Sequence, residues 1–224
     1  MSNFKKILVG AVFAAATTLG ASAANAAVTI HSFASYQSAL NANESLVTDF
    51  NAPLTLAAGW TLGGDASLLT GTSGLGAAPA FGPLDPGDDD PTRYLSVQAG
   101  QVATFTAPNV SRVSLYIGSL DDYNSITFYL KGGGTQVITG LQLGAISGAN
   151  DGDRQQADTN GRFTFYSTEN IVGFDLNSTT NSFEVSNIGA AVPEPATWAM
   201  MIIGFGGVGG MLRSARRKQA VAFA

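Results

Sequence analysis

The side chains that could carry out acid–base, nucleophilic or metal chemistry are few in this 224-residue chain. His31 is the only histidine, and cysteine is absent. A Ser-His-Asp or Cys-His arrangement therefore has no convincing base, and a zinc site has no set of ligands. Carboxylates remain, and two carboxyl groups that flank one glycosidic bond are the machinery of glycoside hydrolysis.

The carboxylates that could form such a pair are spread along the chain. Glu44, Glu169 and Glu184 are the glutamates between the terminal segments, and Asp121-Asp122 is the densest pair. Neighbours on a strand point to opposite faces, so this pair could cooperate only in a turn. We expect it to close such a turn, together with Asn124, through hydrogen bonds to the backbone. The sequence favours a protein without catalytic activity, and a glycosidase using Glu169 or Glu184 is an alternative.

Two glycine-bearing loops gather oxygen atoms that could surround calcium. They are residues 85–91, "DPGDDDP", and residues 150–158, "NDGDRQQAD". In the second loop the candidate ligands are Asp151, Asp153 and Asp158, but Arg154 stands where an EF-hand loop needs a further ligand and a glycine. A solvated acidic loop is the alternative. No cofactor other than calcium is suggested.

Three tyrosines could form a platform for sugar rings. Tyr116, Tyr129 and Tyr166 alternate with apolar residues in their predicted strands and would lie on the opposite face. Exposed aromatic rings can stack on sugars, although cross-strand tyrosines also stabilise sheets without binding a ligand. Trp60, between Gly59 and Gly63, could belong to the core or to a site.

Alternating apolar and polar residues predict an antiparallel all-β domain, a β-sandwich or jelly roll of about ten short strands. The expected turns include Lys131–Gly134 and Asn160-Gly161. A single short helix is expected near Ser32–Leu40, where apolar residues recur at spacings of three and four. The predicted strands are 46–50, 67–70, 94–97, 101–106, 112–118, 125–130, 135–139, 162–167, 171–177 and 182–188.

Charge limits the partners of this domain. Between Ala27 and Val192 five Lys and Arg residues stand against fifteen Asp and Glu residues, a formal net charge of −10. Nucleic acids and other anionic surfaces are therefore disfavoured as partners, whereas divalent cations and neutral sugars are compatible. Disulfides cannot contribute to stability because there is no cysteine.

The first 26 residues are typical of a secretory signal peptide. Lys5 and Lys6 precede the apolar stretch Ile7–Leu19, and small residues follow, with cleavage expected after Ala26. Such a segment implies passage through the Sec translocon.

The C-terminal end carries a second apolar segment. Ala196–Leu212 contains no charged residue, and as a helix it would extend about 25 Å, a short span for a membrane. Because basic flanks stay in the cytoplasm, the positive charges at both ends place the middle of the chain outside. The sorting residues of this region are Pro193, Glu194, Pro195, Trp198, Ala199, Arg213, Arg216, Arg217 and Lys218.

The order Pro-Glu-Pro, Trp-Ala, glycine-rich apolar run and basic cluster resembles a PEP-CTERM sorting signal, in its variant with Trp-Ala after Pro-Glu-Pro. The resemblance implies recognition by an exosortase, cleavage near Pro-Glu-Pro, only transient residence in the inner membrane, and association with the cell surface and exopolysaccharide. Both prolines keep their segment out of the following helix, which leaves a peptide that a protease can reach.

The resulting organisation is a signal peptide at 1–26, a β-sandwich domain at 27–190 and a sorting segment at 191–224. Residues 114–129 and 178–188 are also similar to segments of exosortase-dependent surface proteins of the Npun type. The expected protein is an exported, exosortase-sorted surface or extracellular-matrix protein. A carbohydrate-binding module for exopolysaccharide, with or without calcium, is the alternative.

Overall fold

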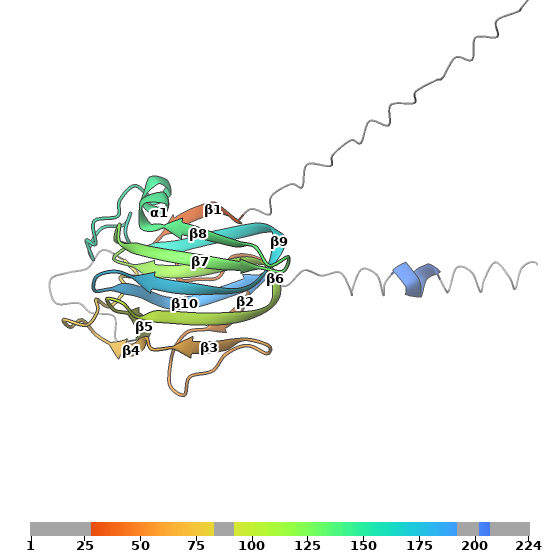
Figure 1. Cartoon of the computed structure of the whole chain (residues 1–224), viewed down its shortest axis with the longest axis horizontal. Coiled ribbons are helices and arrows are strands. Elements are labelled where there is room, and N and C mark those ends of the chain that lie inside the picture. Colours follow the sequence, from red (N-terminus) through yellow and green to blue (C-terminus); the bar gives the residue numbers. More distant parts are fainter. Residues whose placement is uncertain (1–27, 83–91, 192–201, 207–224) are drawn as a thin grey trace, which may run out of the picture.

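The structure is a computed structural model that describes residues 28–82, 92–191 and 202–206. In this part of the chain, ten strands join into one antiparallel sheet (Figure 1). The prediction of an antiparallel all-β domain is confirmed. The strands are β1 (Val28–Ser35), β2 (Ser45–Thr48), β3 (Thr61–Gly64), β4 (Ser67–Thr70), β5 (Arg93–Val97), β6 (Val102–Gly118), β7 (Asn124–Leu130), β8 (Thr135–Thr139), β9 (Gly161–Ser178) and β10 (Phe183–Ala191).

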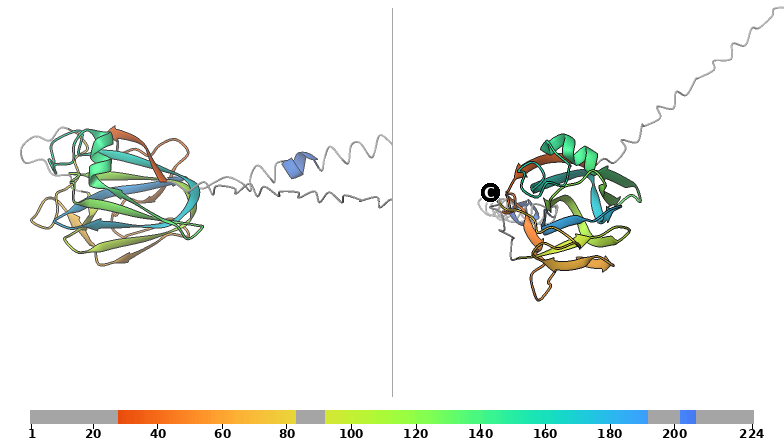
Figure 2. Two further views of the ribbon diagram at one scale, coloured as in Figure 1. Left: turned by 45° about the horizontal axis from the view of Figure 1, so that its top comes forward. Right: turned by 90° about the vertical axis from the view of Figure 1, so that its left-hand side faces the viewer.

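The two longest strands, β6 and β9, each belong to two parts of the sheet. The first half of β6 pairs with β3 and its second half with β10. Likewise β1 pairs with residues 161–167 of β9, and β7 pairs with residues 171–178. The register between β6 and β9 shifts on both sides of Val110, and such bulges bend and twist strands. Figure 2 shows the long strands curving at one end of the molecule, so that the sheet folds over into two layers.

Each of these long strands was predicted as two separate strands. Residues 107–111, which include Pro108 and Asn109, lie between the predicted strands 101–106 and 112–118. Asn109 instead adopts a left-handed conformation, with φ 59°, within the irregular stretch of β6. Asparagine tolerates this conformation, so the chain bulges and continues instead of turning back.

The core between the layers is built from aromatic rings. Phe128 of β7 packs on Phe165 of β9 with ring centroids 5.1 Å apart, and Phe105 stacks on Phe174 at 4.9 Å. Trp60 is 8% exposed and packs edge-on against Phe174, so it belongs to the core. Aromatic side chains bury large apolar areas, and their burial is a main contribution to the free energy of folding.

The prediction of a helix near Ser32–Leu40 is wrong. Residues 28–35 form β1, where Phe33 pairs with Phe163 and packs against its ring. The helical spacing of apolar residues was outweighed by pairing along β9, since strand formation depends on such long-range contacts.

The helix in the domain lies elsewhere, at α1 (Gly140–Ser147). The Thr139 side chain accepts a hydrogen bond from the Gln142 amide, and the Gln142 side chain accepts one from the Thr139 amide. This Thr-x-x-Gln capping box was present in the sequence and was overlooked. The predicted turn Lys131–Gly134 is confirmed as the connection between β7 and β8.

Several predictions fall outside the described residues: the signal peptide, the 85–91 loop, the sorting residues and most of the apolar segment Ala196–Leu212. Residues 202–206 are helical and exposed. Among the described residues, none of the helices combines the length and apolar character that a membrane crossing requires.

Candidate functional site

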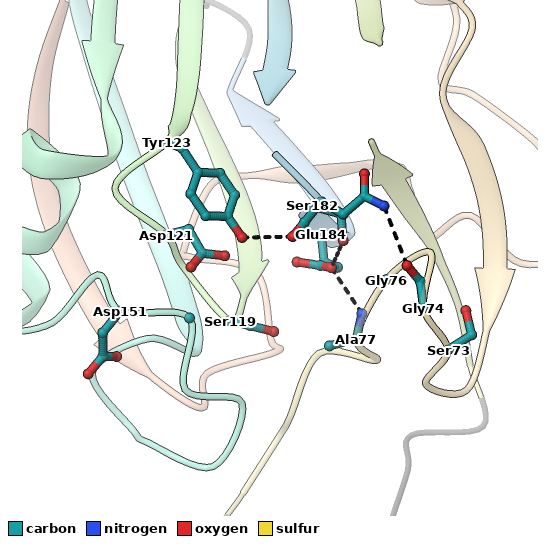
Figure 3. A pocket seen from close by; sticks show the side chains of 12 residues that line it. Ser73, Gly74, Gly76, Ala77, Ser119, Asp121, Tyr123, Asp151, Ser182 and Glu184 are labelled. Carbon is teal, nitrogen blue, oxygen red and sulfur yellow. Dashed lines mark hydrogen bonds between the residues drawn. The ribbon is translucent and has the colours of Figure 1, made fainter. Parts of the chain in front are cut away.

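A polar pocket of about 240 Å³ opens where β10 begins. Four segments that are distant in sequence supply its lining, and Figure 3 shows Tyr123 and Asp121 beside Ser182 and Glu184, with Asp151 at the outer side. The segments are the loop after β4 (residues 73–77), the turn between β6 and β7 (119–123), the loop after α1 (151–152) and residues 181–184.

Glu184 forms the most buried part of the pocket. Phe183 and Val185 point into the apolar core, so strand alternation directs Glu184 to the opposite face. Its Oε1 accepts hydrogen bonds from the Ala77 amide, at 2.9 Å, and from the Ser182 hydroxyl. Its Oε2 has no partner among the described residues, although Glu184 is only 2% exposed. An unpartnered buried oxygen costs roughly 1–3 kcal/mol.

Burial raises the pKa of Glu184 to about 7, because a charged carboxylate loses its hydration. The bonds from Ser182 and Ala77 oppose this shift, and the charge of Asp121 adds to it. At neutral pH the carboxyl group therefore exists in both protonation states and can accept or donate a hydrogen bond.

Asp121 is a second perturbed carboxyl in the same pocket. Burial raises its pKa to about 6, and the charges of Asp122 and Asp151 increase it. The nearby Tyr123 hydroxyl, which donates to the Asn181 carbonyl at 2.8 Å, opposes the rise. An antiparallel bridge between Asp121 and Asp151 brings the 150–158 loop to this edge. Gly152 has φ 72°, and a Cβ there would overlap Asp121 Oδ1, so glycine allows the loop to close on this carboxyl.

Ser119 contributes a buried hydroxyl group without a partner. It adopts a left-handed conformation, with φ 41°, and its Oγ makes no hydrogen bond within the part of the chain that the structure describes. Asn160 holds this turn in place, because its Oδ1 accepts hydrogen bonds from the amides of Ser119 and Ala80, both at 3.1 Å. The turn predicted at Asn160-Gly161 lies at residues 157–160, directly before Gly161 begins β9, and Asn160 is fully buried.

The other catalytic candidates are used elsewhere. Glu44 forms an ion pair with Arg112 at 3.1 Å, and Glu169 lies against Gly132 in the β7–β8 connection. The structure therefore joins Asp121 with Glu184, a pairing that the sequence did not predict. Asn124 closes its turn as predicted, since its Oδ1 accepts the Asp121 amide at 2.9 Å.

The three tyrosines do not form a common platform. Tyr116, predicted to be exposed, is fully buried: its ring packs on Phe81 at 4.6 Å and its hydroxyl donates to the Ala80 carbonyl. The chain around residues 78–81 covers this face of β6, which strand alternation cannot show. Tyr129 and Tyr166 are half-buried and lie along opposite halves of β9.

Each remaining tyrosine is engaged in the sheet. The Tyr129 hydroxyl donates to Asp175 at 2.6 Å. The Tyr166 hydroxyl accepts from Arg112 Nη1 at 2.7 Å. These contacts agree with the alternative that the tyrosines stabilise the sheet.

The predicted calcium ligands do not converge. Asp153 turns back on its own loop, where its oxygens accept from the Gln155 amide at 2.8 Å and the Gln156 side chain at 3.1 Å. Asp151 lines the pocket, whereas Asp158 lies against Gly148. In the described ranges, no group of three or more His, Cys, Asp or Glu residues is placed to hold a metal ion. The positions of these three side chains give the predicted calcium site no support, and calcium binding stays a prediction.

Comparisons with solved structures give only weak likenesses. A peptidoglycan O-acetylesterase is 15% identical over 65% of this chain and 33% of its own, with a TM-score of 0.34. The catalytic domain of a GH87 alpha-1,3-glucanase in complex with tetrasaccharides is 12% identical over 69% of this chain and 29% of its own, with a TM-score of 0.38. CsCBM6-3 from Clostridium stercorarium in complex with cellobiose is 10% identical over 59% of this chain and 87% of its own, with a TM-score of 0.29.

These scores carry no argument about activity. The chain spans a third or less of the length of the esterase and of the glucanase. No curated protein sequence matches it, and the resemblance to Npun-type surface proteins stays a prediction.

The family comparison concerns the C-terminal end. Residues 191–218 match the model of the PEP-CTERM protein-sorting motif, and this range includes Pro-Glu-Pro, Trp-Ala and the basic cluster through Lys218. The resemblance seen in the sequence is confirmed: this chain carries a PEP-CTERM sorting signal, the mark of an exosortase-dependent protein.

Proposed function

We propose that the chain is an exported protein that an exosortase sorts to the surface or extracellular matrix of a Gram-negative bacterium, and that its β-sandwich is non-catalytic. The observation that carries this proposal is the position of the sorting motif. The motif begins at residue 191, where β10 ends. The signal therefore follows the folded domain directly, as a tail that can be removed without disturbing the domain's strands.

Charge supports the same route. The basic residues at both ends favour a cytoplasmic location for those ends. The acidic middle has a formal net charge of −10, so positive charge does not hold it in the cytoplasm. The partners on this route are the Sec translocon, the inner membrane for a limited time, and the exosortase.

Intact-mass analysis tests the proposal. The full chain is produced in a bacterium with an exosortase and in a matched strain lacking it, and protein is recovered from membranes and medium. We expect the exported form to end near Pro193–Pro195 only in the first strain. Exported protein that extends through Ala224 in both strains would refute the proposal.

The basic cluster provides the matched variants. Replacing Arg213, Arg216, Arg217 and Lys218 together by glutamine should leave unprocessed precursor, because the positive flank that fixes the orientation of the tail is lost. Lys131→Gln, in the β7–β8 connection, is the control and should be processed normally.

A second candidate function, carbohydrate binding, is supported by the pocket at Glu184. Sugar sites need several convergent polar groups in a shaped cavity, and this pocket holds two buried polar atoms without partners. Binding of a bacterial exopolysaccharide by the mature protein, measured by affinity electrophoresis with and without calcium, tests it. Equal mobility with and without the polysaccharide would reject this candidate while leaving the sorting proposal intact.

A further inference from the structure

The pocket presents more hydrogen-bonding capacity than the described chain uses. Glu184 Oε2 and Ser119 Oγ are both buried, both lack a partner, and both belong to residues that line this one cavity. Leaving two such groups unsatisfied destabilises the folded protein. A ligand that supplied hydrogen-bond donors here would recover that cost.

The electrostatics of the pocket favour a positively charged ligand. Asp121, Asp151 and Glu184 line it, and within the described residues no Lys, Arg or His does. The carboxylates disfavour one another's ionisation, since the charge of Asp121 raises the pKa of Glu184 and that of Asp151 raises the pKa of Asp121. A cation placed between them would reverse this repulsion, whereas phosphate, sulfate or a uronic acid would increase it.

The volume of the pocket and its other lining residues indicate which kind of cation it could hold. A volume of about 240 Å³ is below the roughly 300–1,000 Å³ of sites for drug-sized ligands, so it suits one small molecule or one unit of a polymer. The Tyr123 hydroxyl donates to the Asn181 carbonyl at 2.8 Å, and the Asn181 side chain bonds the Ala99 amide and the Gly74 carbonyl. Glu184 Oε2 and Ser119 Oγ therefore remain the groups that a ligand would engage. A metal ion is disfavoured because no three acidic side chains among the described residues gather closely enough to hold one.

We propose that this pocket binds one amino-sugar unit in its ammonium form, with the ammonium group toward Asp121 and Glu184 and a ring hydroxyl toward Ser119. The inference rests on the proposed carbohydrate-binding function and adds the charge of the sugar. Ammonium and hydroxyl groups would donate to the acceptors that the chain leaves without partners.

The pocket also lies at the far end of β10 from the sorting tail. Glu184 stands at the start of this strand and Ala191 at its end, a separation of about 23 Å for an extended strand. A protein held by its C-terminal end would therefore present the pocket away from its attachment.

Calorimetric titration of the mature exported protein at pH 7 tests the inference. The probes are glucosamine, N-acetylglucosamine, whose amine is neutralised, and glucose, in which a hydroxyl group replaces it. We expect glucosamine to bind at least tenfold more tightly than the other two. Glu184→Gln keeps the shape of the side chain and should weaken glucosamine binding at least tenfold, whereas Glu169→Gln, a glutamate outside the pocket, should leave it unchanged.

Each outcome separates this inference from the broader function. Equal binding of glucose or N-acetylglucosamine, lost in Glu184→Gln, would overturn the cationic ligand and retain carbohydrate binding. Calcium binding that depends on Glu184, without binding of glucosamine, would overturn it in favour of a metal site. If neither the three sugars nor the exopolysaccharide binds, both the inference and the carbohydrate function fail, and the sorting proposal is unaffected.

Discussion

The pH dependence of stability should report directly on Glu184. Its pKa is raised from 4.5 to about 7 in the folded protein, so between these values the folded state binds more protons than the unfolded state. Stability must then fall as pH rises through this range. The contribution of the neutral carboxyl is fully present below pH 4.5 and lost above about pH 7.

The size of this effect follows from the same shift. A difference of 4.5 to about 7 corresponds to about 3 kcal/mol at 1.36 kcal/mol per pKa unit. Glu184 is 2% exposed, so solvent screening reduces this figure little. Asp121 adds a smaller effect of the same sign, because it is partly exposed and its pKa is raised to about 6.

Glu184→Gln isolates this contribution, since glutamine stays neutral at every pH and can still accept the Ala77 amide. Urea unfolding at pH 5 and pH 8 should show that the free energy of unfolding of the natural protein falls as pH rises. The fall should be smaller in the variant, and the two falls should differ by about 3 kcal/mol. Glu169→Gln serves as the control and should follow the natural protein. Parallel pH profiles of the natural protein and Glu184→Gln would refute the assignment of a raised pKa to this buried carboxyl.

Other substitutions test the packing around the site. Asn160→Ala should lower the free energy of unfolding by about 3 kcal/mol, because two buried amides lose their acceptor, and thermal unfolding measures this loss. Arg162→Met should destabilise by a similar amount, since the buried guanidinium donates to the carbonyls of Ser38 and Ala39, and urea unfolding detects it. Tyr116→Ala should cost about 3–5 kcal/mol as a buried aromatic truncation, and unchanged unfolding would contradict its burial.

Much of the fold could be predicted from local pattern. Alternation at Val113, Leu115 and Ile117 identified the second half of β6, and all three side chains are buried. The same pattern could not show that Tyr116, on the other face, is covered as well. Burial of the second face depends on a loop more than thirty residues earlier, whose carbonyl at Ala80 accepts the tyrosine hydroxyl.

Where the predicted secondary structure differs from the observed one, contacts with residues distant in sequence explain the difference. Residues 32–35 satisfied a helical spacing, but Phe33 finds an aromatic partner in Phe163 across the sheet. Asn109 lay between two predicted strands, and Asn160 was part of a predicted turn. The first makes a bulge within β6 and the second is a buried acceptor, because asparagine serves in either setting through its tolerance of left-handed backbone and its amide side chain.

The pocket could not be derived from the sequence because its two perturbed carboxyls are 63 positions apart, at Asp121 and Glu184. Each was a separate candidate in the sequence: Asp121 belonged to the densest carboxylate pair, and Glu184 was one of three glutamates, with no local signal to bring the two together. The pairing of β10 with β6, which sets Glu184 opposite Gly118, places that strand position beside the turn. In an antiparallel sheet, the end of one strand and the turn that follows its neighbour lie side by side. Asp121 and Glu184 therefore lie together at this end of the sheet, outside the apolar core.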